Sequence, residues 1–191
     1  MAIKTRDRFI WFLENLLVIA LIFLLILTFK RFRLSNLSYS LITILLILHT
    51  IGAHHTYSEV PFIKSLFNIT FDRNNYDRLA HLAFGLLMFY PVLETIRRIA
   101  SIKTMHLLFS LYLPFSIVIS FSALYELVEW ITALIVSPLD AASFLGMQDD
   151  IFDAQKDMLM AAIGALIASI IFLLANNGSY KKYKKDRRNE N

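Results

Sequence analysis

Long runs of apolar residues, nearly free of charge, limit what this chain can fold into. They cover residues 9–29, 37–53, 79–93 (extended by Tyr76 and Thr95), 105–136 and 158–175. A membrane-spanning helix needs about 20 such residues. Hydrophobic residues make up 57% of the chain and charged residues 18%, against about 25% charged in soluble domains. The sequence therefore predicts an all-α fold, a polytopic transmembrane helical bundle of about five spans.

The first and fourth runs decide the number of spans. The fourth run is too long for one crossing, but two crossings would need about 40 residues, so five spans are favoured over six. Pro114 can kink this run, and we expect its turns after Tyr125 to reach the membrane surface or to line a cavity. Basic residues at 30–33, instead of a cleavage site, follow the first run, which indicates a retained anchor. Residues 1–178 are predicted to form one transmembrane domain, and 179–191 a basic cytoplasmic tail.

The distribution of Lys and Arg predicts the orientation. With five spans, the side that holds the C-terminus carries twelve basic residues and the other side carries seven. The positive-inside rule then places the C-terminus in the cytoplasm. The basic tail at 181–188 is explained by attraction to anionic lipids. Membrane lipids are therefore the expected partners, and nucleic acid is not expected.

Acidic and histidine side chains are predicted to gather at the opposite, outer end of the bundle. The ten residues are His49, His54, His55, Glu59, Asp77, His81, Glu126, Glu129, Asp153 and Asp157. Ionisable groups at bilayer depth are unfavourable, so they usually face a bundle interior or a water-filled cavity, where they have a function. We expect these residues to line one pocket that opens outward.

Helical spacing places these residues in pairs. Asp77 with His81 and Asp153 with Asp157 are four residues apart, and Glu126 with Glu129 are three apart, so each pair shares a helix face. Bundle-core metal sites are built from such inward pairs. Imidazole together with carboxylate suits Zn, Mn or Fe, and a bound metal can lower the pKa of water toward ~7. The pattern therefore predicts a divalent metal site.

Each candidate residue receives an expected role. The expected metal ligands are His81, Asp77, His54, His55 and Asp157. The expected catalytic residues are Glu129, Glu126 and Asp153. Further pocket candidates are His49, Glu59, Tyr57, Tyr76, Tyr125 and Asp150. Glu14 ranks below these because it has no pair in its own run. In the alternative interpretation, the carboxylates pair with Arg73, Arg78 and Lys156 and only lock the helices, with Asp77 and Asp153 as helix N-caps.

Several catalytic classes lack their signatures. The chain has no cysteine, which excludes thiolate metal sites, disulfides and a Cys nucleophile. It has no His-Glu-x-x-His zinc helix and no Gly-x-Ser-x-Gly elbow. It also has no Gly-rich phosphate loop, which argues against nucleotide-driven chemistry.

Short motifs agree in order with a known family. They are Thr56-Tyr57, Val60-Pro61, Asn75-Tyr76-Asp77-Arg78 with His81, Tyr125-Glu126-Leu127-Val128-Glu129-Trp130, and Asp150, Asp153, Gln155 with Asp157-Met158. On these residues the chain resembles the YjdF-type bacterial inner-membrane proteins over about 45–170. Asp149 and Phe152 stand where that family would have Gly and Trp. A weaker similarity to VanZ-like membrane proteins rests on Asp77-x-x-x-His81, Asp153 to Asp157 and Gly164-Ala165. The resemblance implies the bacterial inner membrane and no established activity.

Two classes of function fit these observations. The favoured one is a metal-dependent, membrane-embedded hydrolase or transferase that acts on a lipid or cell-envelope intermediate. The alternative is a non-enzymatic protein that binds or moves an ion or proton, or a structural partner protein whose polar cluster locks the helices. The inner halves of the last two long runs, 107–116 and 165–174, are nearly uncharged, which favours a one-sided pocket over a transmembrane pathway.

Overall fold

The computed structural model describes residues 5, 7–61, 65–66, 69–70, 73–101, 106–145 and 148–189. The helices are α1 (Arg8–Thr28), α2 (Asn36–His54), α3 (Tyr76–Ile99), α4 (Leu107–Ile135), α5 (Pro138–Leu145) and α6 (Asp153–Asn189). Two short strands, β1 (Ser65–Leu66) and β2 (Ile69–Thr70), pair antiparallel between α2 and α3. The predicted all-α bundle is thus confirmed.

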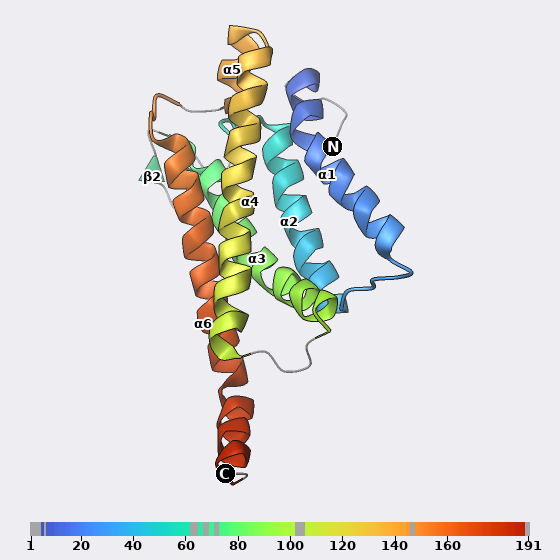
Figure 1. Ribbon diagram of the computed structural model, residues 1–191. Helices are drawn as coiled ribbons and strands as arrows, with labels where there is room; N and C mark the ends of the chain where they lie inside the picture. Colours follow the sequence, from blue (N-terminus) through green and yellow to red (C-terminus); the bar gives the residue numbers. More distant parts are fainter. Residues whose placement is uncertain are drawn as a thin grey trace.

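Five of the helices are long and apolar enough to cross a membrane. They are α1, α2, α3, α4 and the 153–175 part of α6, and they match the five apolar runs of the sequence. Helix α4 has 29 residues with Pro114 inside it, so at 1.5 Å per residue it is about 44 Å long. That exceeds a hydrocarbon core of about 30 Å. Figure 1 shows the end of α4 standing beyond the start of α6, next to α5.

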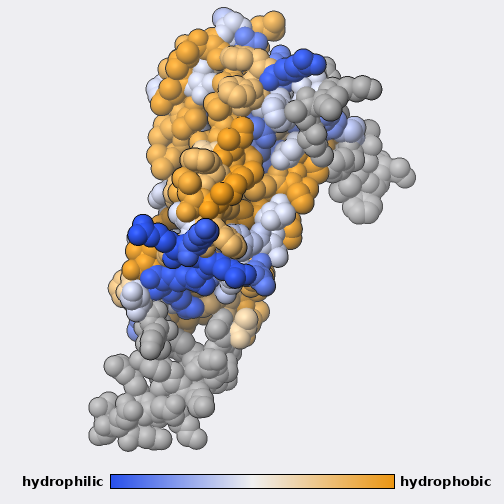
Figure 2. Space-filling view, turned by 90° about the vertical axis from the view of Figure 1, so that its right-hand side faces the viewer, coloured by the Kyte–Doolittle hydropathy of each residue, from blue (hydrophilic) through white to orange (hydrophobic). Residues whose placement is uncertain are grey.

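The bundle has two chemically different ends. At the end that we call the acidic end, α2 and α4 finish and α3 and α6 begin. At the opposite end, the basic end, α1 and α3 finish, α2 and α4 begin, and α6 continues past the bundle (Figure 1). Figure 2 shows a band of hydrophobic surface with hydrophilic side chains above and below it. This is the surface expected of a bundle that sits in a bilayer.

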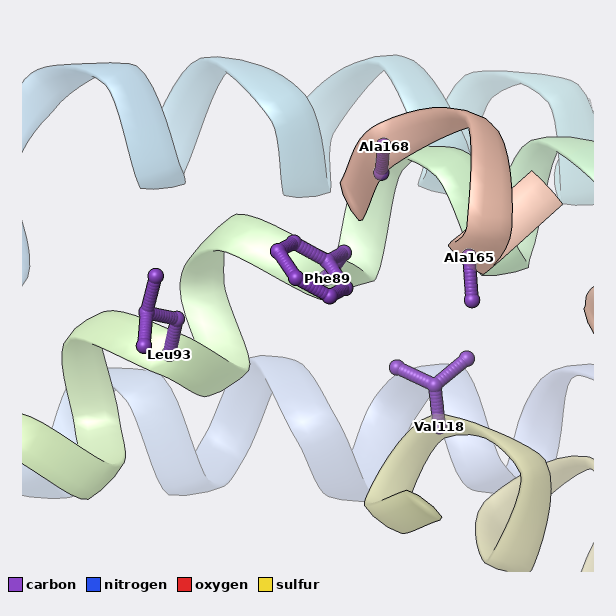
Figure 3. Close-up of a cluster of buried hydrophobic side chains, with 5 residues drawn as sticks. All are labelled: Phe89, Leu93, Val118, Ala165 and Ala168. Carbon is purple, nitrogen blue, oxygen red and sulfur yellow. The ribbon is translucent and has the colours of Figure 1, made fainter. Parts of the chain in front are cut away.

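The core lies where α3, α4 and α6 meet. Phe89 and Leu93 of α3 pack with Val118 of α4 and with Ala165 and Ala168 of α6 (Figure 3). All five side chains are buried. The alanines leave room for the bulky Phe89 ring, which allows α6 to come close to α3.

Two glycines bring the backbones of α3 and α6 into direct contact. A Cβ atom on Gly85 would lie 2.0 Å from the carbonyl oxygen of Ala161, and one on Gly164 would lie 2.1 Å from that of Leu82. Small residues at helix crossings allow such close approach in membranes. The contact sets the register of α3 against α6, and therefore how the polar residues at their first turns meet.

Helix α6 has no break at the predicted boundary between the membrane domain and the basic tail. It runs from Asp153 to Asn189, while its membrane-spanning part covers 153–175. The backbone of the predicted tail is therefore helical as far as residue 189. Residues 190–191 lie outside the described part.

Candidate functional site

The first turns of α3 and α6 and the second half of α4 form a compact polar cluster at the acidic end. Asp77, His81 and Asp157 each offer a ligand atom within 4.8 Å of the others. The Nε2 atom of His81 lies 3.7 Å from Oδ1 of Asp77 and 3.3 Å from Oε1 of Glu126. Asn75, not Asp77, is the N-cap of α3, so the N-cap interpretation is wrong for Asp77. We call Asp77, His81, Glu126 and Asp157 the central cluster.

Two carboxylate oxygens of the central cluster are buried without a hydrogen-bond partner among the residues that the structure describes. They are Oε1 of Glu126 and Oδ1 of Asp157. The residue Asp157 is only 2% exposed. Buried polar atoms nearly always have a partner, and an exception usually indicates an ion, a water molecule or a catalytic role. The two oxygens are therefore free to accept a proton or to contact a cation.

A buried serine lies against the other ring nitrogen of His81. The Oγ atom of Ser122 is 3.4 Å from Nδ1 of His81, and Ser122 is 1% exposed. The Tyr125 ring meets the His81 ring edge-on, at 5.8 Å between centroids. If Nδ1 donates to Ser122, the lone pair of Nε2 points toward Asp77 and Glu126, as in a metal-binding histidine oriented by an outer partner.

A separate ionic network lies beside the central cluster. Asp153 pairs closely with Arg73 and lies 3.7 Å from Arg78. Asp150 lies 2.5 Å from Arg78, 2.7 Å from Lys156 and 3.8 Å from Arg73. Hydrogen bonds from Lys156, the Phe152 amide and Arg78 lower the pKa of Asp150 to about 2. Asp153 and Asp150 thus form ion pairs with Arg and Lys side chains, and within the described part of the chain no such pair within 4 Å is found for Asp77 or Asp157.

Hydrogen bonds of Asn74 and Gln148 join the segment before α3 to the segment before α6 and to Val60. Asn74 is buried, and its side chain donates to the carbonyl of Val60 at 2.9 Å. The backbone N–H of Asn74 donates to Oε1 of Gln148, and Nε2 of Gln148 donates back to the backbone carbonyl oxygen of Asn74. This reciprocal pair joins the segments that precede α3 and α6.

A third polar group links α1, α2 and α4. Tyr125 donates its hydroxyl to Oε2 of Glu14 at 3.0 Å. The Nε2 atom of His49 lies 3.0 Å from the carbonyl oxygen of Glu14, and the Tyr57 hydroxyl lies 2.6 Å from Nδ1 of His49. Burial raises the pKa of Tyr57 well above its usual range, so its hydroxyl donates. Glu14 is 3% exposed, so it belongs to this buried group although it has no pair in its own apolar run.

The remaining candidates lie around these groups. The His54 and His55 rings are 4.7 Å apart at the end of α2, and neither belongs to the three-residue group that could hold a metal. Burial, followed by the charge of His54, lowers the pKa of His55. The Tyr76 hydroxyl donates to the Leu48 carbonyl at 2.8 Å. Glu59 lies in the turn after α2.

Sequence reasoning missed three contributors to the site, Ser122, Asn74 and Gln148. Ser122 was missed because a serine in an apolar span carries no local signal, and it lies 41 residues from His81 in the chain. Asn74 and Gln148 are similarly ordinary loop residues until the fold joins them. The signal for Glu14 was present, since a carboxylate inside an apolar run is unfavourable unless it faces inward.

Comparisons with known proteins agree with this architecture. The family described as "Predicted membrane protein (DUF2238)" matches residues 1–178. The chain is 34% identical over 174 residues to "Inner membrane protein YjdF" of Escherichia coli (strain K12), covering 90% of this chain and 80% of that protein. No solved structure matches. The similarity to VanZ-like proteins stays an expectation. With five apolar helices and this relative, the protein is a multi-pass inner-membrane protein, and it belongs to the DUF2238 family of predicted membrane proteins.

Proposed function

We propose that the central cluster binds one divalent metal ion, and that the protein is a hydrolase or transferase acting on a lipid or cell-envelope intermediate. Asp77, His81 and Asp157 would be the ligands. The observation that carries the proposal is the convergence of these three residues within 4.8 Å, together with the unpartnered buried oxygens of Asp157 and Glu126.

The donor atoms suit a small transition metal. Ligands at about 2.1 Å from a tetrahedral ion are roughly 3.4 Å apart. The distance from Nε2 of His81 to Oδ1 of Asp77, 3.7 Å, lies close to that value. One imidazole with carboxylates is the donor set of Zn, Mn or Fe sites. Ser122 would then hold the ring, as outer partners of metal-bound histidines do.

The surrounding carboxylates supply acid–base chemistry. Catalytic zinc sites use three protein ligands and keep a fourth position open. A metal bound here would lower the pKa of water toward ~7. Glu126, beside Nε2 of His81, would accept the proton, and Glu129, which interacts with Glu126 and Tyr125, would return it to the leaving group. Asp153, also expected to be catalytic, would position Arg73 and Arg78 beside the site.

The setting of the cluster favours a substrate carried by the membrane. It lies at the end of the spans, and α4 exposes Leu127, Trp130 and Ile131 on its outer surface close to Glu126 and Glu129. Aromatic side chains such as Trp130 are common at the level of lipid headgroups. A lipid headgroup or a lipid-linked envelope precursor would therefore meet the cluster from the membrane surface, which the positive-inside rule makes the outer one.

Metal analysis of the purified protein tests the first half of the proposal. Wild-type protein, purified in mild detergent without chelator, should carry nearly one equivalent of Zn, Mn or Fe. His81→Ala and Asp157→Asn should lose it, while Asp149→Asn, which changes an exposed aspartate outside the cluster, should keep it. Wild-type protein without metal, even after incubation with each ion, would refute the site.

The variant Glu126→Gln tests the second half of the proposal, the hydrolase or transferase activity. If Glu126 is the base, this variant retains the metal, and the lipid and precursor pools of cells that carry it should differ from those of wild-type cells. Purified wild-type protein, but not Glu126→Gln, should then convert the species that accumulates. Thermal destabilisation of both Glu126→Gln and Glu129→Gln with no metal loss would favour a purely structural cluster.

The structural alternative has an observation of its own. Arg73, Arg78 and Lys156 neutralise Asp150 and Asp153 and join the start of α3 to the start of α6. In a non-enzymatic protein this network would lock the helices, and the central cluster would bind or pass an ion or proton. Proton or ion flux into vesicles that contain the wild-type protein, absent for His81→Ala, would favour this function.

A further inference from the structure

An open groove lies between α1 and α2 near the basic end, at the opposite end of the bundle from the central cluster. Its walls include Ile22 and Ile26 of α1 and Ile42 and Leu46 of α2, and its volume is about 620 Å³. Figure 1 shows α1 leaning away from α2 as the two helices approach this end. The volume falls in the range of roughly 300–1,000 Å³ that is usual for small-molecule sites.

Polar and cationic groups close the lower end of the groove. Lys30 and Tyr39 line it, and the Tyr39 hydroxyl accepts a hydrogen bond from the Leu34 amide at 3.3 Å. Arg31 and Arg33 follow Lys30 and are exposed, and the Arg33 guanidinium lies 5.4 Å from the centroid of the Phe29 ring. The groove is therefore apolar along its length and positively charged at one end.

Glu94, the nearby carboxylate, pairs with Arg98 and not with the groove cations Lys30 and Arg31. Glu94 lies 2.7 Å from Arg98 and accepts hydrogen bonds from Ser35 and Ser38. Among the described residues, no carboxylate forms an ion pair with Lys30 or Arg31. Figure 2, which views the α1 side, shows hydrophilic side chains gathered directly below the hydrophobic band. Lys30 and Arg31, which are exposed and directly follow α1, offer positive charge at this end of the bundle.

We propose that this groove is a binding site for an anionic glycerophospholipid. One acyl chain would lie between α1 and α2, and the phosphodiester would contact Lys30 and Arg31, with the Tyr39 hydroxyl near the glycerol region. The charge pattern favours this occupant over another apolar helix, because a helix would leave the cations without a counter-charge. Basic pockets between transmembrane helices are known to bind anionic lipid headgroups.

Binding of defined lipids to the full-length protein tests the proposal. Detergent-purified, delipidated protein would be titrated with phosphatidylglycerol or with phosphatidylcholine of the same acyl chains, and bound lipid counted by native mass spectrometry. Phosphatidylglycerol should bind more tightly. The double variant Lys30→Gln, Arg31→Gln should weaken its binding roughly 25-fold, because each cation near an anionic lipid contributes about fivefold, and phosphatidylcholine binding should not change.

Two matched controls separate the site from general charge and hydrophobicity. Arg8→Gln removes an exposed cation at the acidic end and should have no effect. Thr43→Trp places a bulky ring in the groove and should lower phosphatidylglycerol binding. Leu24→Trp, on an exposed position of α1 outside the groove, should not.

Three outcomes would overturn the lipid site. Equal binding of the two lipids would show that the protein does not recognise the anionic headgroup. An unchanged affinity of Thr43→Trp for phosphatidylglycerol would show that the lipid does not bind in the groove. A wild-type dimer that Thr43→Trp converts to monomer would show that a second copy of the chain, not lipid, occupies the groove.

Discussion

Glu94 at the basic end and Asp157 at the acidic end are both acidic side chains inside membrane-spanning helices, but their surroundings differ. The Glu94 carboxylate accepts hydrogen bonds from the Ser35 amide and the Ser35 and Ser38 hydroxyls, and it pairs with Arg98. Asp157 is buried, and its Oδ1 atom has no partner. In the sequence, each is a carboxylate at the edge of an apolar run, 79–93 for Glu94 and 158–175 for Asp157.

The difference separates a structural carboxylate from one that is available for a ligand. The hydrogen bonds of Glu94 join the N-terminus of α2 to α3, and its acceptor atoms are used. At the acidic end, the cations Arg73, Arg78 and Lys156 pair with Asp150 and Asp153, while the adjacent central cluster keeps unpaired oxygens. An uncompensated buried carboxylate is strongly unfavourable, so a bound cation or proton is the natural counterpart.

The largest expected effect concerns which side of the membrane each end faces. A reporter fused after Asn191 should be cytoplasmic, and one inserted in the 137–148 segment should be external, because the positive-inside rule places the more basic side in the cytoplasm. Enzymatic reporters that are active on only one side would give an all-or-none result. Both reporters on one side would contradict the five-span arrangement, and a reversed result would turn the central cluster toward the cytoplasm.

Substitutions of Glu94 and Asp157 should differ in their effect on the free energy of unfolding. Glu94→Leu should lower the stability of the solubilised protein by roughly 1.5–3 kcal/mol or more, the value of a hydrogen bond to a charged group. Asp157→Asn should leave the metal-free protein at least as stable as wild type, because it removes a buried charge without a partner. Thermal unfolding with and without added metal measures both. Destabilisation of metal-free Asp157→Asn would show that Asp157 is a structural residue like Glu94.

The variant Ser122→Ala tests whether Ser122 orients the His81 ring at the acidic end. If Ser122 orients the His81 ring, its loss should weaken metal binding about 10–100-fold, as for other outer-shell changes, while the fold is retained. Ser120→Ala is a matched control, because its hydroxyl donates to the Ser116 carbonyl of its own helix. Competition with a fluorescent chelator would measure both affinities, and equal values would remove Ser122 from the site.

The smallest effect concerns pH and the ionic network. The pKa of Asp150 is lowered from 3.8 to about 2 in the folded protein, so its stabilising effect is present above about pH 4 and is lost as the pH falls toward 2. The difference in melting temperature between wild type and Asp150→Asn should therefore be larger at about pH 6 than at about pH 3. Asp149→Asn is the control. If the difference in melting temperature between wild type and Asp150→Asn does not change with pH, the charge of Asp150 does not stabilise the contact between the starts of α3 and α6.

The membrane architecture and the candidate residues follow directly from the amino-acid sequence. Uncharged runs long enough to cross a bilayer predict spans directly, since each helix satisfies its own backbone hydrogen bonds. This is why the predicted runs agree with α1, α2, α3, α4 and α6 to within a few residues. The pairing of Asp77 with His81 on one face likewise follows from the helical repeat alone.

Which polar residues contact one another depends instead on how the helices pack. The close approach of α3 and α6 at Gly85 and Gly164 sets their register, and that register places Asp157 against Asp77 and His81 while Asp153 meets Arg73. Helical spacing made the aspartates at 153 and 157 equivalent members of one pair. Their roles separate because contacts between distant helices depend on shape and packing at the crossing, which no local pattern of residues records.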